Sequence, residues 1–217
     1  MSASDSRSLM LERIRRALNV QPDDPRESRR QQEWHALPRD YRRLGKLDEQ
    51  ERLALFEERI REYNATTYHS NGNVAAEIEN ILSSRGKRIL IVPTGFPSNW
   101  LPGGFMFIPD ENLSYRQLNS NDGVVTACTL AIALTGTIVL QSSPGQGRRA
   151  TSLVPDYHLC VLRKQHIVEI LPEALRQLEP VKDQPLTFIS GPSATVDIEM
   201  TRVRGVHGPR VLDVLIV

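Results

Sequence analysis

Cysteine is scarce in this chain of 217 residues, and the scarcity limits the redox chemistry open to it. The two cysteines, Cys128 and Cys160, stand apart in the apolar segments VVTACTLAIAL and HLCVL. An iron–sulfur cluster usually takes four cysteine ligands from spacings such as C-x2-C, which excludes one here. We predict two small buried side chains and no cofactor held by this chain, so that electrons of any redox reaction would travel through another molecule.

No charge of one sign dominates, and no long hydrophobic run is present. Lys and Arg number 27 against 26 Asp and Glu, a net charge of +1 that gives no reason to expect nucleic acid as a partner. No stretch approaches the ~18 uninterrupted apolar residues of a membrane span. The opening MSASDSRSLMLERIRRALNV breaks its apolar residues with Arg and Glu, unlike a signal peptide. The composition predicts a soluble cytoplasmic protein.

Metal-ligand and nucleotide-binding motifs are missing as well. The five histidines are scattered without the spacing of a metal site, so none is predicted. Neither the P-loop pattern G-x4-G-K-S/T nor the Rossmann pattern G-x-G-x-x-G occurs. Any bound anion must therefore be held by loops of another kind.

The sequence that is present divides into two parts. Residues 5–18 place their apolar side chains at helical spacing and predict an amphipathic helix. Residues 19–46 carry prolines and many charges without a period, which indicates a linker or a wrapping arm. We expect an N-terminal helix and Pro/Arg-rich arm over 1–46, followed by one domain over 47–217.

The second part alternates strands and helices. Helical periodicity over 48–63 and 73–86 flanks a strand candidate at 65–70, and the apolar run 88–92 follows. Strand, helix, strand is typical of a parallel sheet. Further elements are expected over 124–142 (a strand, a short turn or helix, and a strand), 157–171 (two strands), 171–178 (a short helix), 186–190 and 211–217 (strands). The predicted class is α/β, with an open and mostly parallel sheet flanked by helices.

The loop SSPGQGRRATSLVP combines glycines with positive charge. Gly145 and Gly147 allow backbone shapes that turn successive N–H groups toward an anion. Arg148 and Arg149 add guanidinium groups for a carboxylate or phosphate. The stretch is an anion-binding loop or a mobile hairpin loop with solvated arginines, and taken alone it favours neither.

The segment GPSATVDIEM follows an apolar strand and begins with a glycine turn. Gly191 opens the turn, and Ser193 or Thr195 is placed to cap a helix that begins near Thr195. Asp197 and Glu199 would then lie in or near the first turn of that helix, where negative charge is stabilised. A helix that starts directly after a strand and a glycine is a ready anion site.

The segment RVRGVHGPR is predicted to be a loop before the last strand. Its His207 stands between Gly205 and Gly208. The imidazole is a candidate acid, base or hydrogen-bond donor, although a lone loop histidine is more often structural. His158 begins a strand, and there we predict a structural histidine with its hydrogen bonds satisfied.

Several of these stretches recur together in one known family. In order they are Thr135-Gly136-Thr137, Gly147-Arg148-Arg149, Pro155 with His158, Gly191-Pro192-Ser193 through Glu199, and Gly205 through Pro209. Each is weak alone. The ordered set, ending in GVHGP before a terminal strand, resembles the lactate utilization protein C family, built on the LUD domain. The resemblance covers roughly 48–217, and the helix at 5–18 is similar to that family's usual start.

The resemblance implies a fold and a role. The fold would be similar to the sugar-phosphate isomerase and CoA transferase group. The chain would be one of three proteins encoded together for growth on L-lactate, which oxidise L-lactate to pyruvate. Its partners would be a cysteine-rich protein and an iron–sulfur protein, and the iron–sulfur clusters would lie in those partners. This chain would be a non-redox substrate-handling or accessory subunit.

Two departures from the family pattern remove polar groups from the expected site. Leu134 stands where the family commonly has an acidic residue before Thr-Gly. Ala194 stands where an arginine usually follows Gly-Pro-Ser.

These observations leave three hypotheses open. The first is a subunit of a lactate-oxidising system, with a small anionic ligand bound by the shared loops. The second is a stand-alone enzyme or binding protein for a phosphorylated or CoA-linked small molecule, by fold analogy alone. The third is a purely structural subunit; homo-oligomerisation is open in all three. The candidate ligand-binding residues are Thr135, Gly136, Thr137, Gly145, Gly147, Arg148, Arg149, Gly191, Ser193, Thr195, Gly205 and Gly208, and the candidate catalytic residues are His207, Asp197 and Glu199.

Overall fold

The computed structural model describes residues 3–18, 25–196, 202–204 and 208–217. The chain forms two compact units, Met1–Tyr41 and Arg42–Val217. In the first unit, helix α1 (Ala3–Ala17) confirms the amphipathic helix predicted at its start.

The second helix of the first unit, α2 (Pro25–Ala36), corrects a prediction, because that stretch was expected to be a linker or arm without regular structure. Pro25 is the first helical residue, where the missing N–H and fixed φ of proline are tolerated. The helix has no apolar stripe, and its described side chains are exposed. It gains support from pairs one turn apart, such as the ion pair of 3.1 Å between Arg29 and Glu33. A helix exposed on all sides shows no hydrophobic period.

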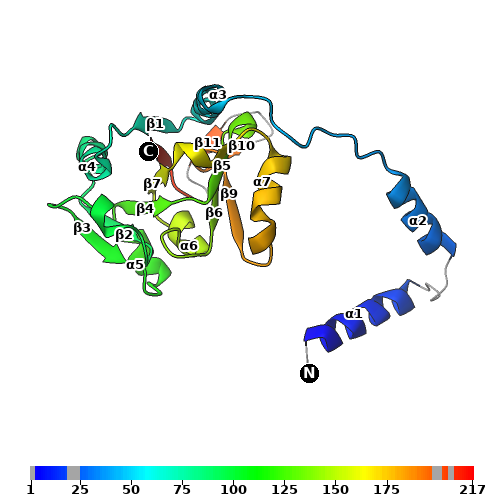
Figure 1. Ribbon diagram of the computed structural model, residues 1–217. Coiled ribbons are helices and arrows are strands. Elements are labelled where there is room, and N and C mark those ends of the chain that lie inside the picture. Colours follow the sequence, from blue (N-terminus) through cyan, green and yellow to red (C-terminus); the bar gives the residue numbers. More distant parts are fainter. Residues whose placement is uncertain (1–2, 19–24, 197–201, 205–207) are drawn as a thin grey trace. The chain divides into compact units, whose positions relative to one another are not determined.

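The second unit is built on six parallel strands, which confirms the predicted sheet (Figure 1). Every neighbouring pair in it is parallel. In spatial order the strands are β1 (Thr66–His69), β12 (Val211–Ile216), β7 (Tyr157–Leu162), β4 (Gly123–Ala127), β2 (Ile89–Val92) and β3 (Met106–Pro109). The edge strand β3 was not predicted, since MFIP is short and ends in proline.

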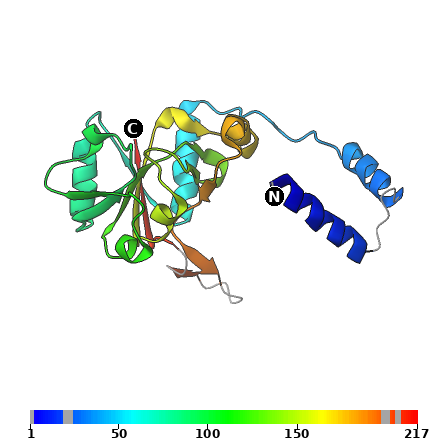
Figure 2. The same cartoon turned by 90° about the horizontal axis from the view of Figure 1, so that it is seen from below.

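Helices cover both faces of this sheet (Figure 2). On one face, α4 (Val74–Ser84) packs Ile78 and Leu82 against Leu90 and Leu159. On the other face, α3 (Glu49–Glu62) packs Phe56 and Ile60 against the core around Cys160 and Val214. Both cysteines are free and buried, as predicted. The mostly apolar sequences of the central strands follow from burial on both faces.

A second sheet of four strands lies beside α7 (Leu171–Leu178) and mixes parallel with antiparallel pairs. Its strands are β8 (Ile167–Val168), β5 (Leu130–Ile132), β6 (Thr137–Gln141) and β9 (Leu186–Ile189). Between β5 and β6 lies one 3-10 turn, η2 (Ala133–Thr135), which confirms the predicted strand, turn, strand. So short a connection allows only antiparallel pairing.

Short helices fill the remaining connections. They are η1 (Ser98–Trp100), α5 (Tyr115–Asn119), α6 (Arg149–Leu153), η3 (Lys164–His166) and η4 (Glu179–Val181). Helix α6 joins the glycine-rich loop after β6 to the start of β7. It therefore carries the charged end of that loop to the central strands of the large sheet.

The prediction of a helix that begins near Thr195 is wrong. Strands β10 (Ala194–Val196) and β11 (Arg202–Arg204) pair there as an antiparallel ribbon at the edge of the domain (Figure 2). Thr195 and Val196 are β-branched, and such side chains favour a strand over the first turn of a helix. This preference outweighs the capping signal of Ser193. The loop predicted over 202–204 is likewise a strand.

The first residues of the second unit are fastened to its body by Glu169, whose side chain is 4% exposed. Arg42 contacts this carboxylate at 2.7 Å, and the N–H groups of Lys46 and Leu47 donate to it. Burial would raise the pKa of Glu169, but these donors outweigh it and hold the pKa below its ordinary value. The carboxylate therefore fixes where the domain begins.

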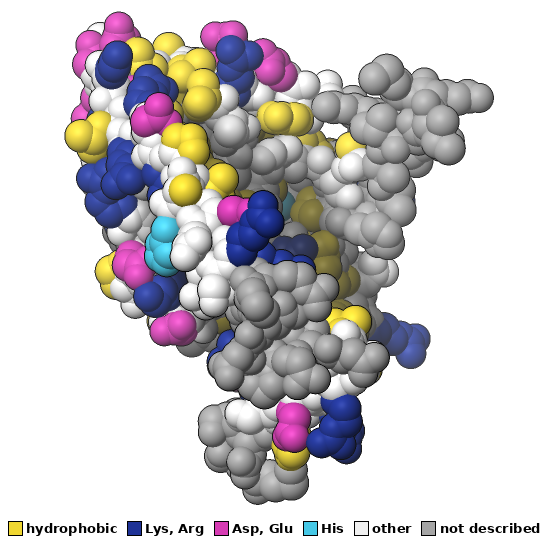
Figure 3. Space-filling view, turned by 90° about the vertical axis from the view of Figure 1, so that its right-hand side faces the viewer, with side chains coloured by type: hydrophobic (Ala, Val, Ile, Leu, Met, Phe, Trp, Pro, Cys, Tyr) yellow, Lys and Arg dark blue, Asp and Glu magenta, His cyan; other side chains and the backbone are white. Residues whose placement is uncertain are grey.

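Figure 3 shows one face of the molecule, on which hydrophobic, basic and acidic side chains are intermingled. The coloured side chains of that face do not gather by charge, in keeping with the net charge of +1.

Candidate functional site

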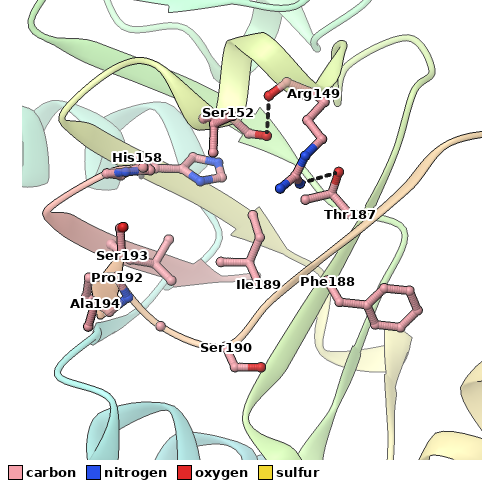
Figure 4. Close-up of a pocket in the computed structure, with 15 residues that line it drawn as sticks. Arg149, Ser152, His158, Thr187, Phe188, Ile189, Ser190, Pro192, Ser193 and Ala194 are labelled. Atoms are coloured by element: carbon pink, nitrogen blue, oxygen red, sulfur yellow. Dashed lines mark hydrogen bonds between the residues drawn. The ribbon is translucent and has the colours of Figure 1, made fainter. Parts of the chain in front are cut away.

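A cavity of about 380 Å³ lies between α6, the strand β9 and the first residues of β7 and β12 (Figure 4). It is lined by a basic residue, a histidine, several hydroxyl or small polar positions and an apolar remainder. These residues are Arg149, Ser152, Leu153, His158, Thr187, Phe188, Ile189, Ser190, Gly191, Pro192, Ser193, Ala194, Gly208, Pro209 and Leu212. The volume suits a small molecule.

Arg149 supplies the positive charge of this cavity. It begins α6, and its Nη1 donates to Thr187 Oγ1 at 3.3 Å (Figure 4). Within the described ranges, no carboxylate forms an ion pair with it. An arginine whose neighbour is a hydroxyl keeps most of its donors for an anion. Arg149 is an exposed residue that lines this cavity, and anion binding by its loop stays a prediction.

Several hydroxyl groups line the same cavity. Ser152 Oγ donates to the carbonyl of Arg149 at 3.3 Å. Ser190, which sequence reasoning missed, lies within 2.8 Å of Thr137, measured between the two hydroxyl oxygens. Thr137 in turn lies 2.7 Å from Thr135. The predicted Thr-Gly-Thr turn thus reaches the cavity through Ser190 and does not line it.

Gly136, between these two threonines, has a packing role. Its φ of 55° is left-handed, and a Cβ at this position would lie 2.6 Å from the backbone nitrogen of Ile60 in α3. Only glycine allows both the conformation and the close approach of the helix. Gly136 therefore places α3, which is a structural role for one predicted ligand-binding residue.

Gly191, Ser193 and Gly208 come together at the cavity, as their motifs suggested. The N–H of Ser193 donates to the carbonyl of Pro209 at 2.8 Å. Gly191, at φ 88°, packs directly against the side chain of Tyr63. The Gly-Pro-Ser turn and the final Gly-Pro step are therefore one piece of the cavity wall.

His158 is the feature that the sequence prediction got wrong. It is fully buried on β7 and lines the cavity, with its ring directed toward Ser152 and Ile189 (Figure 4). Its Nε2 lies 2.7 Å from Thr126 Oγ1, but among the described residues its buried Nδ1 has no hydrogen-bond partner. The histidine is therefore only half satisfied. Burial lowers its pKa to about 4, so the ring is neutral at pH 7.

A second cavity, of about 350 Å³, lies at the carboxyl ends of β2 and β3. Its lining consists of Pro93, Thr94, Asp110, Asn112, Ser142, Ser143, Pro144, Gly147 and Arg148. Gly145 fastens this loop there, because its N–H donates to Thr94 and its carbonyl accepts from Ala127, each at 2.8 Å. The chain order reverses between β2 and β4, and such a switch point is a common ligand crevice.

Arg148 points into this second region and is occupied by Asp110. Its Nε and Nη2 donate to the two carboxylate oxygens of Asp110, each at 3.0 Å, and Nη2 also donates to the carbonyl of Leu113. Burial would raise the pKa of Asp110, but hydrogen bonds from Arg148 and Thr151 leave that pKa below its ordinary value. The two adjacent arginines are thus separated: Arg148 braces the fold, and Arg149 faces the first cavity.

Part of the predicted site falls outside the described residues. Asp197, Glu199, Gly205 and His207 are among these. For Thr195 the backbone lies in β10, and its side chain is not described. Of the two family departures, Ala194 lines the cavity and Leu134 is an exposed residue of η2.

The described residues form neither a metal cluster nor a membrane-spanning helix. Among them, no three His, Cys, Asp or Glu side chains group as metal ligands. No helix in the described part of the chain is long and apolar enough to cross a membrane.

Comparison with known proteins gives one consistent result. The LUD domain matches residues 108–217. Lactate utilization protein C of Deinococcus radiodurans is 43% identical over 176 residues, which covers 79% of this chain and 82% of that protein. Uncharacterized protein YkgG of Escherichia coli is 40% identical over 105 residues, 46% of this chain and 44% of its own length. The crystal structure of a DUF162 family protein from Deinococcus radiodurans superposes with a TM-score of 0.68 and 37% identity, covering 79% of this chain and 99% of that one.

Proposed function

Because this chain belongs to the lactate utilization protein C family of LUD-domain proteins, we propose that it is the subunit that binds the small carboxylate substrate in the oxidation of L-lactate to pyruvate. Its relatives' name places the family in lactate utilization. The finer proposal is a role without a redox centre of its own, beside iron–sulfur and cysteine-rich partner proteins.

The observation that carries this proposal is the position of Arg149 in the first cavity. A guanidinium that faces a hollow, with a hydroxyl as its described partner, is suited to a carboxylate. Thr187, Ser190 and Ser193 add hydroxyls that donate or accept hydrogen bonds. Ile189 and Leu212 supply apolar wall for a methyl group. The cavity therefore has the groups needed for a three-carbon hydroxy acid.

In the oxidation of L-lactate, these residues would bind and orient the substrate without accepting its electrons. Oxidation of L-lactate to pyruvate removes two electrons and two protons from the C2 carbon and its hydroxyl. The cysteine spacing of this chain gives no iron–sulfur cluster, so the electrons pass to clusters in the partners. Arg149 would hold the carboxylate, and the hydroxyls would bind the C2 oxygen, so that the C2–H bond faces the partner that accepts the two electrons and the two protons pass to solvent.

The test is L-lactate-dependent dye reduction by the reconstituted complex. It compares the wild-type chain, no chain, Arg149→Gln, and Arg116→Gln as a matched control at an exposed arginine outside both cavities. We expect turnover to need the chain, Arg149→Gln to raise KM about tenfold or more, and Arg116→Gln to behave as wild type. Turnover that does not need the chain would sink the proposal.

One set of contacts favours the purely structural subunit as a second candidate. Arg148 is committed to Asp110, and Gly136 to the packing of α3, so two residues of the family pattern serve the architecture. In that case the complex needs the chain but tolerates Arg149→Gln. The same assay therefore separates the two functions.

A further inference from the structure

The buried side chains of the described residues leave two nitrogen or oxygen atoms without a hydrogen-bond partner, Arg52 Nε and His158 Nδ1. His158 is the more informative, because it is wholly buried and lines the cavity that Arg149 faces. A buried polar group without a partner costs free energy, so each such group needs an explanation. A ligand in the cavity would supply one.

The contact with Thr126 decides which nitrogen carries the proton. Thr126 is fully buried on β4, and His158 Nε2 is the partner described for its hydroxyl. If Nε2–H donated to Thr126, the hydroxyl hydrogen and the Nδ1 lone pair would both lack partners. If the hydroxyl donates to Nε2, the proton sits on Nδ1, and Nδ1–H alone lacks a partner. The second arrangement leaves one unsatisfied group instead of two, so it is favoured.

The strand register makes this arrangement rigid. His158 on β7 pairs with Val124 on β4, which places Thr126 two residues further along on the same face of the sheet. Both side chains stand on neighbouring central strands of the six-stranded sheet. The ring therefore has a fixed orientation and a fixed tautomer, which is how a site presents a donor in advance of its ligand.

We propose that His158 Nδ1–H is a fixed hydrogen-bond donor for the C2 oxygen of a 2-oxygenated acid whose carboxylate is held by Arg149. This inference rests on the proposed function for the class of ligand. A hydroxyl or a carbonyl at C2 accepts the hydrogen bond. A C2 ammonium group presents donors to a donor, and a C2 methylene presents nothing. L-lactate and pyruvate fit the site, whereas L-alanine and propionate do not.

Two substitutions at one position separate the two nitrogens. His158→Gln places a side-chain amide near the Nε2 position, which keeps a partner for Thr126 and removes the donor at Nδ1. His158→Asn places its amide near the Nδ1 position, which keeps a donor for the ligand and releases Thr126. Thr126→Val removes the hydroxyl that fixes the tautomer while keeping the shape of the side chain.

The first experiment is nitrogen NMR of the full chain labelled with 15N-histidine, with His158→Gln used to assign the His158 signals. We expect Nδ1 to show the signal of a protonated nitrogen, Nε2 that of an unprotonated one, and Thr126→Val to abolish that preference. A protonated Nε2 in the wild-type protein overturns the inference, whatever the ligand is.

The second experiment is calorimetric binding of L-lactate, pyruvate, L-alanine and propionate. We expect lactate and pyruvate to bind the wild type about tenfold more tightly than propionate, with no measurable binding of alanine. His158→Gln should lose most of that preference, and His158→Asn should keep more of it. An unchanged preference in His158→Gln overturns the inference. If the complex still needs the chain for turnover in that case, the proposed function stands; if turnover does not need the chain, the proposed function falls separately.

Discussion

Acidification should destabilise this protein through His158, and the size of the effect follows from its pKa. The ordinary value of 6.5, taken for the unfolded chain, falls to about 4 in the folded protein because the ring is buried. The folded state thus resists protonation that the unfolded state accepts. Stability from this residue is fully present above pH 6.5 and is lost as the pH falls toward the folded pKa.

The magnitude can be worked from the two pKa values. Relative to pH 7, linkage gives a loss of about 2 kcal/mol at pH 5 and about 3 kcal/mol at pH 4. That is a large part of the roughly 5–15 kcal/mol that holds a typical domain together. Carboxylates such as Asp110 and Glu169, whose pKa values are lowered, add their own loss at still lower pH.

The assay is urea unfolding at pH 7, 6, 5 and 4 for the wild type and His158→Gln. Gln does not titrate, so the difference between the two proteins isolates the histidine from every carboxylate. The wild type should lose about 2 kcal/mol more than the variant between pH 7 and pH 5. Parallel losses in the two proteins would refute the reasoning, because they would mean that His158 titrates near its ordinary pKa.

Two further substitutions test the structural roles assigned above. Gly136→Ala should cost about 2 kcal/mol more than Gly86→Ala in chemical unfolding, since both positions have φ near 60° but only Gly136 has the α3 backbone against it; equal costs would show that the contact with α3 is unimportant. Asp110→Asn should cost about 2 kcal/mol by leaving Arg148 without its carboxylate, whereas Asp156→Asn, at an exposed pair, should cost less than about 1 kcal/mol; a similar cost for both would contradict the bracing role of Arg148.

Much of the fold could be predicted because its signals are local. The strand β2 is a continuous apolar run, β12 is apolar except for Asp213, and α3 and α4 carry helical periodicity. The misses have local causes too. Helix α2 has no apolar stripe because it is exposed, and β3 ends in proline. The strand β10 lies where a capping signal predicts a helix, because the β-branched Thr195 and Val196 favour a strand.

The site was predicted less completely, because its chemistry depends on neighbours far away in the sequence. Arg148 and Arg149 are adjacent and identical in type, so the sequence does not distinguish them. In the structure Arg148 binds Asp110, whereas Arg149 lines the first cavity. The half-satisfied state of His158 depends on Thr126, 32 residues away on another strand. No pattern in a single sequence reports such a pairing. Gly191, Ser193 and Gly208 do line the cavity, and their Gly-Pro turns can be recognised in the sequence. Ligand binding by these residues stays a prediction.

Arg149 is proposed to hold the carboxylate of the substrate in the first cavity. The most direct measurement is calorimetric titration of L-lactate into the full chain, comparing wild type, Arg149→Gln and Arg116→Gln. We expect measurable binding by the wild type and by Arg116→Gln, and binding weakened about tenfold or more in Arg149→Gln. Equal affinities in all three proteins, or no binding of lactate by the wild type, would contradict it.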